Sequence, residues 1–436
     1  MISPNEYAER RQRAVNLMES PSIMILYSGV EKVSSADEGY PFEVNRNFYY
    51  LTGIDQPDSV LLLLNSEGEM KEFLFISPYD ERKEKWYGKR LKSEEASAIS
   101  GISNVMTNLS LQAKLEMILG ENAYGEVSRV YLDLDREIKI ADDTDTREMK
   151  RILENTYSDI IVNDAFPLIT TLRLRKSARE VEEFREASRV TKLGIYAIWA
   201  NMKDGMKEYE LADVFHHIIN DENGYQGVSF NTIMASGRNA AILHYPNPQG
   251  IVKDGDLLLS DLGSRHNYYC ADITRCAPVN GKFNDFQRLV YGIVLGCNKM
   301  IASIAKPGVT IEELQNATIE YLSSECLRHG IIEKKEDISK YYFHGVSHLI
   351  GLDTHDPYKI PCSPEYKKLK LEPGMIISDE PGLYIAEKNI GVRIEDDLLI
   401  TETGNRILGK PIPNTVEDVE RCCAEDVGGI HIPGVF

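Results

Sequence analysis

The chain has 436 residues, 42 % apolar and 27 % charged, a composition typical of a globular protein with two or three domains. Its 68 acidic and 49 basic residues give a formal net charge of −19, which argues against the basic footprint of a nucleic-acid-binding protein. The sequence holds no run of about 18 apolar residues, so we expect no membrane span.

The first part of the chain alternates apolar runs with polar, periodic segments. It opens on Ser3, followed by a proline and, three residues on, by Glu6, a signature of a helix start. This start lacks the apolar region of a secretory signal, which favours a cytoplasmic location. Strands are predicted at Ile23–Tyr27, Val60–Leu64, Phe73–Ile76 and Val130–Leu134, with the periodic segments Glu94–Ile99 and Leu109–Leu119 between them. The alternation over about 165 residues predicts a separate α/β domain.

The cysteines say more about the compartment than about the fold. Their number is odd and no two of them form a C-x-x-C pair, so a disulfide framework is not expected and a reducing compartment is. The seven are Cys270, Cys276, Cys297, Cys326, Cys362, Cys422 and Cys423.

A different pattern begins after about residue 168. Ser177 and Glu180 form a capping box that predicts a long helix, and a second helix is predicted near Glu208–Asn220. Strands are then expected at Val228–Ala235, Leu257–Gly263 and Tyr268–Cys276.

The same order of elements then recurs. A long amphipathic helix contains Phe286 and Ile304, and Thr310 with Glu313 caps the next one. Strands are predicted at Tyr341–Val346, Met375–Tyr384 and Gly391–Thr401. Two successive copies of helix, helix and strands predict an internally duplicated domain, although the copies are not alike in sequence.

Two aspartates fall at the ends of predicted strands in the first copy. Asp261 ends an apolar strand, and Asp272 follows a short hairpin loop near Asn267. Side chains on paired antiparallel strands lie close together, so the two carboxylates can converge. A single aspartate in such a place is more often a turn or edge residue, so this pair alone is weak support for a site.

The second copy contains two nearby histidines, His344 and His348. Their spacing is that of the helical H-E-x-x-H zinc motif, but Gly345 stands where that motif has its glutamate and weakens a helix. His348 therefore fits better as a ligand on a strand or loop, with His344 and His355 as neighbours. A single histidine is more often a core residue.

Two glutamates complete the set. Glu380 ends a strand at a Pro-Gly turn, where a glutamate is usually solvated. Glu395 follows Val392-Arg393-Ile394 inside an apolar strand, where a lone carboxylate costs several kcal/mol unless it is paired, with Arg393 for example, or bound to a metal. Four carboxylates and one imidazole suit two divalent ions of the Mn(II), Fe(II) or Co(II) kind, which can activate a water molecule. The sequence thus predicts a dinuclear metallohydrolase.

The joint order of these residues resembles the aminopeptidase P and prolidase family of pita-bread metallopeptidases. The resemblance rests on the phrases NTIMASGRNAAILHY, ADITR, HGVSHLIGLDTHD, DEPGLYI and GVRIEDD, and it covers roughly residues 170–420. The earlier NRNFYYLTGIDQPDSVLLL and KWYGKRL look like the N-terminal domain of aminopeptidase P. The resemblance implies an α+β protein with a creatinase-like α/β domain at 1–168 and a pseudo-twofold pita-bread catalytic domain at 169–436.

The resemblance also implies a ligand set. Asp261 would hold one metal ion, while Asp272 and Glu395 would bridge two. His348 and Glu380 would complete the second site, and Glu380 would also take the proton of a bridging water. The ions in this family are usually manganese, sometimes cobalt, iron or zinc.

Four further residues receive roles by the same resemblance. His244 and His355 would polarise the scissile carbonyl and help move a proton to the proline nitrogen. His344 and Arg393 would shape the pocket on the leaving-group side. The implied substrates are peptides with proline at the second position, and the implied assembly is a homodimer or homotetramer in which Trp86 is a candidate contact, unless this side chain packs within its own domain. Neither a nucleic acid nor a membrane is expected as a partner.

The implied activity is hydrolysis of the Xaa-Pro bond at a peptide N-terminus. An Xaa-Pro bond has no N–H and a fixed φ, so it needs a dedicated cleft and an acid near the leaving nitrogen. Asp379 before Glu380, the short connection Ala386–Ile390 and the tail KPIPNTVEDVE favour an Xaa-Pro aminopeptidase over a prolidase. A methionine aminopeptidase would lack the first domain. Creatinase, which works without metals, and the non-catalytic pita-bread binding modules have lost ligands that are all present here.

Overall fold

The computed structural model describes residues 2–66, 69–134, 144–157, 159–224, 226–357, 364–409 and 411–424. The chain divides into two compact units, Met1–Arg173 and Leu174–Phe436. Within the described ranges, no helix combines the length and the apolar composition needed to cross a membrane. The six described cysteines are free thiols, while Cys362 lies outside the described residues.

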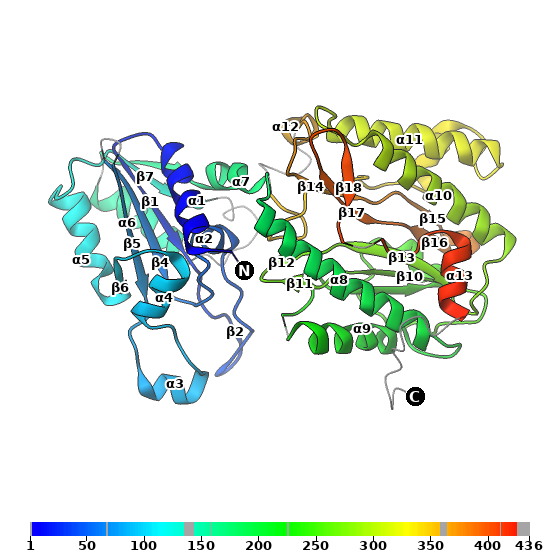
Figure 1. The fold of residues 1–436 in the computed structure, drawn as a ribbon, viewed down its shortest axis with the longest axis horizontal. Helices are drawn as coiled ribbons and strands as arrows, with labels where there is room; N and C mark the ends of the chain where they lie inside the picture. Colours follow the sequence, from blue (N-terminus) through cyan, green and yellow to red (C-terminus); the bar gives the residue numbers. More distant parts are fainter. Residues whose placement is uncertain are drawn as a thin grey trace. The chain divides into compact units, whose positions relative to one another are not determined.

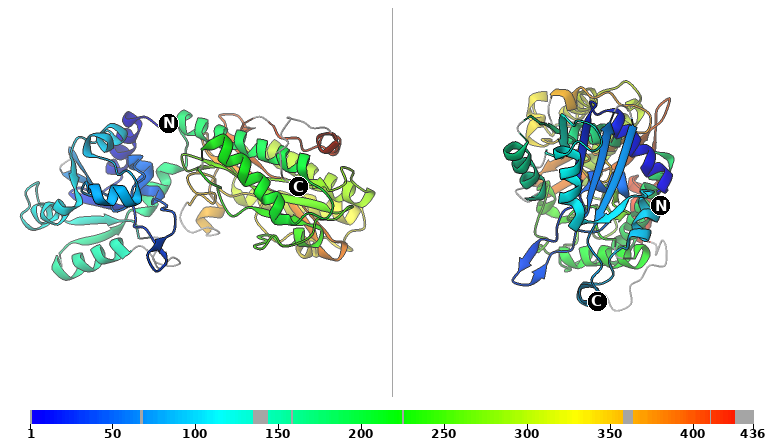
Figure 2. Two further views of the ribbon diagram at one scale, coloured as in Figure 1. Left: turned by 90° about the horizontal axis from the view of Figure 1, so that it is seen from below. Right: turned by 90° about the vertical axis from the view of Figure 1, so that its left-hand side faces the viewer.

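The first unit is a mixed sheet with helices on both faces (Figures 1 and 2). Its sheet has the strand order β6-β5-β4-β1-β7-β8, in which β1 pairs antiparallel with β4 and parallel with β7. Every residue of β1 is buried, as expected for a strand covered on both faces. The strands are β1 (Ser22–Tyr27), β2 (Val33–Ser35), β3 (Glu38–Gly39), β4 (Val60–Ser66), β5 (Glu69–Ile76), β6 (Val105–Thr107), β7 (Arg129–Leu132) and β8 (Ile161–Asp164).

The helices of this unit are mostly short. Ser3 caps the first of them through a 3.3 Å bond from the Glu6 amide, as its sequence predicts. The helices are α1 (Pro4–Asn16), α2 (Arg46–Thr52), α3 (Glu81–Tyr87), α4 (Ser93–Ser100), α5 (Leu111–Leu115), α6 (Thr144–Thr156) and α7 (Phe166–Arg173), with the short turns η1 (Asn108–Ser110) and η2 (Glu116–Gly120). The predicted α/β organisation of this region is confirmed.

The second unit contains the predicted duplication. Its first copy has two helices followed by the sheet β13-β10-β9 and the small hairpin β11-β12. The elements are α8 (Ala178–Asn201), α9 (Glu208–Asn223), β9 (Ile233–Ser236), η4 (Gly237–Ala241), β10 (Leu257–Leu262), β11 (Arg265–His266), β12 (Tyr269–Cys270) and β13 (Ile273–Pro278). The Ser177–Glu180 capping box opens α8 as predicted.

The second copy repeats this plan with the sheet β14-β17-β18 and the hairpin β15-β16. Its elements are α10 (Asp285–Ile304), α11 (Ile311–Arg328), η5 (Lys335–Lys340), α12 (Pro364–Lys367), β14 (Ile376–Asp379), β15 (Gly382–Ile385), η6 (Ala386–Lys388), β16 (Ile390–Arg393), β17 (Asp396–Ile400) and β18 (Asn405–Ile407), followed by α13 (Val416–Ala424). Thr310 and Glu313 cap α11 as predicted.

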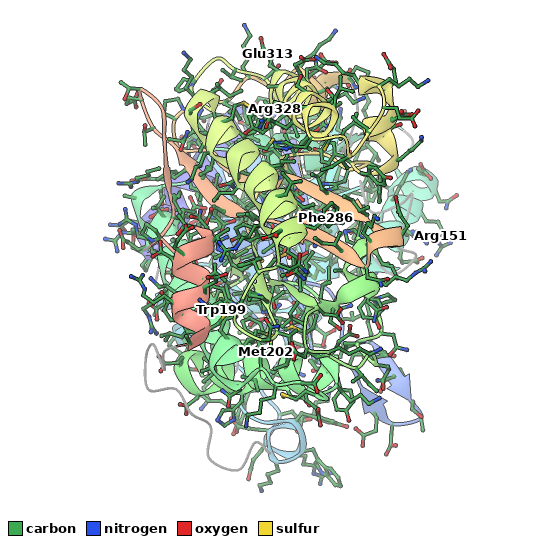
Figure 3. The ribbon with its side chains drawn as sticks, turned by 90° about the vertical axis from the view of Figure 1, so that its right-hand side faces the viewer. Arg151, Trp199, Met202, Phe286, Glu313 and Arg328 are labelled. Carbon is green, nitrogen blue, oxygen red and sulfur yellow. The ribbon has the colours of Figure 1, made fainter. Side chains whose placement is uncertain are left out.

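The helices of each copy cover the strands of that copy. α8 and α9 lie side by side and pack on β13 and β9, whereas α10 packs on β14, β15 and β16 (Figure 1). One hydrophobic core runs through both copies, and Trp199, Met202 and Phe286 pack in it (Figure 3). The two copies are thus joined into a single body that can present side chains from both at one place.

Two predicted strands need correction. Tyr341–Val346 is a loop, because its backbone bonds go singly to different neighbours: the Tyr384 amide donates to the Tyr341 carbonyl and the Glu380 amide to that of Val346. The strand predicted from Val228 begins only at Ile233. The predicted break at Glu380 is confirmed, since β14 ends at Asp379 and β15 begins at Gly382.

Candidate metal centre

The candidate centre lies where two pairs of antiparallel strands end. In the first copy Asp261 pairs with Thr274 across β10 and β13, and Asp272 directly precedes β13. In the second copy Glu380 follows β14 and Glu395 precedes β17, next to the register pair Asp379 and Asp396. Each copy therefore delivers two carboxylates from one strand-pair end, with a small hairpin between them in the sequence.

All five predicted ligands come together. Three overlapping groups have ligand atoms within 4.8 Å of one another. They are Asp261 with Asp272 and Glu395, His348 with Glu380 and Glu395, and Asp272 with His348 and His355. The last group adds His355, which the sequence prediction gave a role on the substrate instead.

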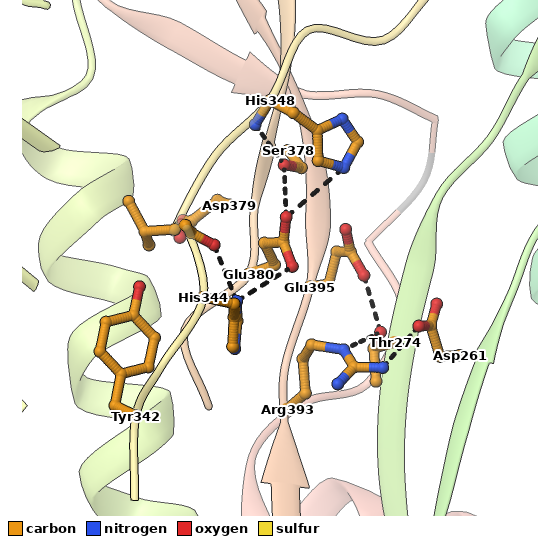
Figure 4. Close-up of polar contacts among 12 residues, drawn as sticks. Asp261, Thr274, Tyr342, His344, His348, Ser378, Asp379, Glu380, Arg393 and Glu395 are labelled. Carbon is orange, nitrogen blue, oxygen red and sulfur yellow. Dashed lines mark hydrogen bonds and ion pairs between the residues drawn. The ribbon is translucent and has the colours of Figure 1, made fainter. Parts of the chain in front are cut away.

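The His348 ring is held with one nitrogen facing the carboxylates. Its Nδ1 lies 3.0 Å from the carbonyl oxygen of Leu349, to which it can donate. Its Nε2 then lies 3.4 Å from an oxygen of Asp272 and 3.4 Å from one of Glu380 (Figure 4). A backbone carbonyl that fixes the tautomer is the usual support of a metal-binding histidine.

Hydroxyl groups orient the two glutamates. Thr274 donates to Glu395 at 2.7 Å, and Ser378 donates to Glu380 at 3.2 Å (Figure 4). The hydroxyl of Ser378 also accepts the backbone N–H of His348 at 2.9 Å. Because Ser378 bonds to both ligands, it fixes Glu380 and His348 relative to each other.

Arg393 contributes the positive charge at the edge of the cluster. Its guanidinium donates to Asp261 at 2.5 Å, to the Thr274 hydroxyl at 3.1 Å and to the Tyr384 hydroxyl at 2.8 Å. The suggested partner Glu395 is not its ion-pair partner. The other Asp261 oxygen is buried and has no hydrogen-bond partner among the described residues.

The carboxylates crowd one another in a buried place. Burial, followed by the charges of Asp261 and Asp397, raises the pKa of Asp272 well above its ordinary value. Burial and then Asp272 and Glu380 do the same to the pKa of Glu395, and burial raises the pKa of Glu380. Divalent cations would relieve this repulsion, and the free Asp261 oxygen offers a further ligand atom. The residues present therefore fit a pair of hard divalent ions.

Two further predicted histidines, His344 and His355, lie beside the cluster. His344 lies 3.6 Å from Glu380 and 2.8 Å from the Tyr384 hydroxyl, while the ring centroids of His355 and His348 are 4.3 Å apart. Burial and then Arg393 lower the pKa of His344 to about 3, whereas the charge of His348 and then burial lower the pKa of His355 to about 4. Both rings are thus neutral near pH 7.

His244 stands apart from this network. It is exposed, and among the residues that the structure describes it makes no hydrogen bond. It lies near the site all the same, because its charge is one of the lesser causes that lower the pKa of His344 and of His355, after those named above. A side chain that is close, exposed and unbonded is free to meet a bound substrate.

Sequence reasoning missed the supporting side chains. Thr274 and Tyr384 lie inside the quoted phrases ADITR and DEPGLYI, but hydroxyl groups carry no ligand signal of their own. Asp397 was missed as well: it accepts the Asp272 amide at 3.2 Å, and burial raises its pKa to about 8. The repeated acids of IEDD were the signal that could have found it.

Family profiles cover most of the chain. The profile described as Metallopeptidase family M24 matches residues 182–402, and the profile described as Aminopeptidase P, N-terminal domain, matches residues 7–127. The first match contains all five candidate ligands.

Relatives are similar over nearly their whole lengths. The Xaa-Pro aminopeptidase of Escherichia coli is 32 % identical, over 96 % of this chain and 97 % of its own. A Bacillus anthracis structure provisionally assigned to aminopeptidase P is 40 % identical with a TM-score of 0.92, covering 98 % of this chain and 99 % of that one. Zinc-substituted aminopeptidase P of E. coli in complex with product is 31 % identical with a TM-score of 0.87, covering 97 % and 98 %. The predicted α+β fold class is confirmed.

Proposed function

Because the chain belongs to metallopeptidase family M24, with the N-terminal domain of aminopeptidase P, we propose that it is an Xaa-Pro aminopeptidase. It is a metal-dependent exopeptidase that hydrolyses the bond between the first residue of a peptide and a following proline. The observation that carries the proposal is that both copies contribute to one cluster of four carboxylates and one imidazole. In each of its overlapping groups the ligand atoms lie within 4.8 Å of one another.

The proposed ligands of two divalent ions are Asp261, Asp272, His348, Glu380 and Glu395. When bound, such ions lower the pKa of a water molecule and polarise the scissile carbonyl. We assign the bridging positions to Asp272 and Glu395, one from each copy. Manganese is our proposal for the native ion, since hard oxygen donors with a single nitrogen suit it.

Glu380 is the proposed general base. Its carboxylate is one of the more accessible of the set, with a side chain 16 % exposed, and one of its oxygens is already held by Ser378. The burial that raises its pKa makes it a better proton acceptor than an ordinary surface glutamate. It would take the proton of the attacking water.

The histidines and Arg393 would handle the substrate. We propose that His244 and His355 polarise the scissile carbonyl and carry the proton to the leaving proline nitrogen, which cannot depart unprotonated. His344 and Arg393 would bound the pocket on the leaving-group side, where they share the Tyr384 hydroxyl. The surrounding negative charge suits the free α-ammonium of an exopeptidase substrate.

The test is a substrate series with metal added. Purified protein with Mn(II) or Co(II) in excess is assayed on Gly-Pro dipeptide and on Xaa-Pro tripeptides. We expect efficient release of the first residue from tripeptides and poor cleavage of the dipeptide. Better cleavage of the dipeptide would indicate a prolidase. Protein that binds none of Mn, Co, Fe or Zn and is not activated by them would instead be a binding module.

We also propose that the protein is a homodimer or homotetramer. The supporting feature is α3, which has no buried residue and presents Trp86 at 82 % and Tyr87 at 68 % exposure. Aromatic side chains this exposed are typical of interfaces. Sedimentation of the wild type and of Trp86→Ala should show the loss of the assembly in the variant.

The domain boundary at 168 and 169 and the cytoplasmic location stay predictions.

A further inference from the structure

The segment of residues 237–250, here called the His244 segment, is the first part of the connection from β9 to β10 and has little regular structure. After η4 its backbone forms only turns and extended chain. His244 lies in one of these turns, is exposed and makes no hydrogen bond among the described residues. Something outside the segment must therefore fix where the imidazole stands.

One buried carboxylate bonds to both ends of the His244 segment. Glu208, the first residue of α9, has no exposed surface. At the start of the segment its Oε1 accepts the Ser236 amide at 2.8 Å, the Ser236 hydroxyl at 3.0 Å and the Asn239 side-chain amide at 3.0 Å. At the far end its Oε2 accepts the Gly250 amide at 2.8 Å.

The residues around this carboxylate are closely packed. A Cβ at Gly250 would lie 2.5 Å from the Asn239 side-chain nitrogen and 2.6 Å from the Glu208 Oε2. Near the start of the segment, in η4, the Ala240 carbonyl lies against β16, where a Cβ at Gly391 would be 2.0 Å from it. The segment is thus clamped at both ends and supported by β16 near its start.

A carboxylate is the only side chain that fits this clamp. The Ser236 amide and hydroxyl, the Asn239 side-chain amide and the Gly250 amide are all donors, and a carboxylate accepts on both oxygens. A glutamine has only one accepting oxygen, so its NH₂ group would face either the Gly250 amide or the donors at the start of the segment, and a donor would then face a donor. The energetic cost of burying the charge is offset because every accepted bond is charge-assisted.

We propose that Glu208 is a positioning residue for His244, an inference that rests on the proposed peptidase function. By closing the His244 segment at both ends, Glu208 holds the imidazole where the substrate carbonyl arrives. Loss of the clamp would leave the metal ligands untouched, because none of them lies on this segment. Its effect should appear in kcat and should depend on the presence of His244.

The test is a double-mutant cycle with Glu208→Gln, His244→Ala and the double variant. On an Xaa-Pro tripeptide with Mn(II) in excess, we expect Glu208→Gln to lower kcat about tenfold, because small misplacements of a catalytic group are costly. In the His244→Ala background the same change should lower kcat less than twofold. Bound metal per chain should be unchanged. An equal loss in both backgrounds would overturn the proposal.

The matched control is Glu420→Gln, a buried glutamate that accepts the Phe283 amide at 3.0 Å away from the site. It should leave kcat unchanged. If Glu208→Gln does not fold, Asn239→Ala removes one bond of the clamp and takes its place. If His244→Ala has no measurable turnover, binding of the product-like dipeptide Pro-Leu, measured by calorimetry, replaces kcat in the cycle.

Hydrogen exchange separates this inference from the proposed function. Glu208→Gln should speed the exchange of the Ser236 and Gly250 amides, whether or not any peptide is cleaved. Unchanged exchange at both amides would show that the clamp does not exist. Inactive wild-type protein with faster exchange in the variant would instead contradict only the peptidase function.

Discussion

The two copies in the second unit share a plan but differ in how firmly they hold their carboxylates. In the first copy Asp261 and Asp272 have side chains 10 % and 6 % exposed, and Asp261 forms an ion pair with Arg393. In the second copy Glu380 and His348 have side chains 16 % and 17 % exposed. The comparison teaches that the two most accessible candidate ligands, Glu380 and His348, belong to the second copy, while the exposed His244 comes from the first.

The largest expected effect tests this division directly. Glu380→Gln should lower kcat by about a thousandfold yet retain part of its metal, since a general base is typically worth 10²–10⁴-fold. Asp272→Asn should lose metal and activity together, because it removes the charge of a proposed metal ligand. Turnover in excess Mn(II) and elemental analysis of the same samples measure both. Wild-type rates in Glu380→Gln would refute its role.

A smaller effect is expected for His355→Ala. If His355 acts on the substrate, kcat should fall about a hundredfold while metal content changes little. The structure makes this a sharp test, because His355 also belongs to a ligand group with Asp272 and His348. Metal content that falls in step with kcat would make His355 a sixth ligand, contributed by the second copy.

The supporting hydroxyls should have a milder effect, one in each copy. Thr274→Val removes the bond to Glu395, and Ser378→Ala removes the bonds to Glu380 and the His348 amide. Groups that orient ligands are worth 10–100-fold in metal affinity, so each change should weaken Mn(II) binding by about tenfold. Calorimetric titration measures it. An effect of Thr274→Val alone would mean that only Glu395 needs such support.

The smallest effect concerns pH in the metal-free protein. The buried carboxylates have a higher pKa in the folded protein than in the unfolded chain. Between these two pKa values the folded state binds more protons, so the free energy of unfolding falls as pH rises toward the folded pKa. Between pH 7 and 8 His344 and His355 are largely neutral in both states, which leaves carboxylates such as Asp397, with a pKa of about 8, to dominate. The Tm of chelated protein should fall by several degrees over this window, and Mn(II) should flatten the fall.

Much of the fold could be predicted because local signals agreed with global ones. The capping boxes at Ser177 and Thr310 act within one helical turn, so the sequence suffices to place them. The strand prediction at Tyr341–Val346 was wrong because Tyr342 and Val346 are buried like strand residues, while the backbone groups bond to separate partners and not to one neighbouring strand. The Gln315 side chain, from α11, accepts the Val346 amide at 2.7 Å, a long-range contact that no local pattern announces.

The candidate site divides in the same way. A carboxylate has few reasons to lie in apolar surroundings, so Glu395 could be singled out from its own segment, whereas Asp261 could be singled out only from the joint order of the motifs. Their partners could not be found in this way. Arg393 stands two residues from Glu395 but bonds to Asp261 in the other copy, because the register of the strands decides which groups meet. Glu208 carried no signal at all, being one of many helical glutamates.

The order of the ligands along the chain has a consequence for biosynthesis. Asp261 and Asp272 are synthesised well before Glu380 and Glu395, and the strands next to them form one core with α10 and α11. A ribosome adds about 5–20 residues each second, so a nascent chain spends several seconds with half a coordination sphere. Loading of a pair of divalent ions must therefore follow translation of these strands, and we expect a truncated product without Glu380 and Glu395 to bind no such pair.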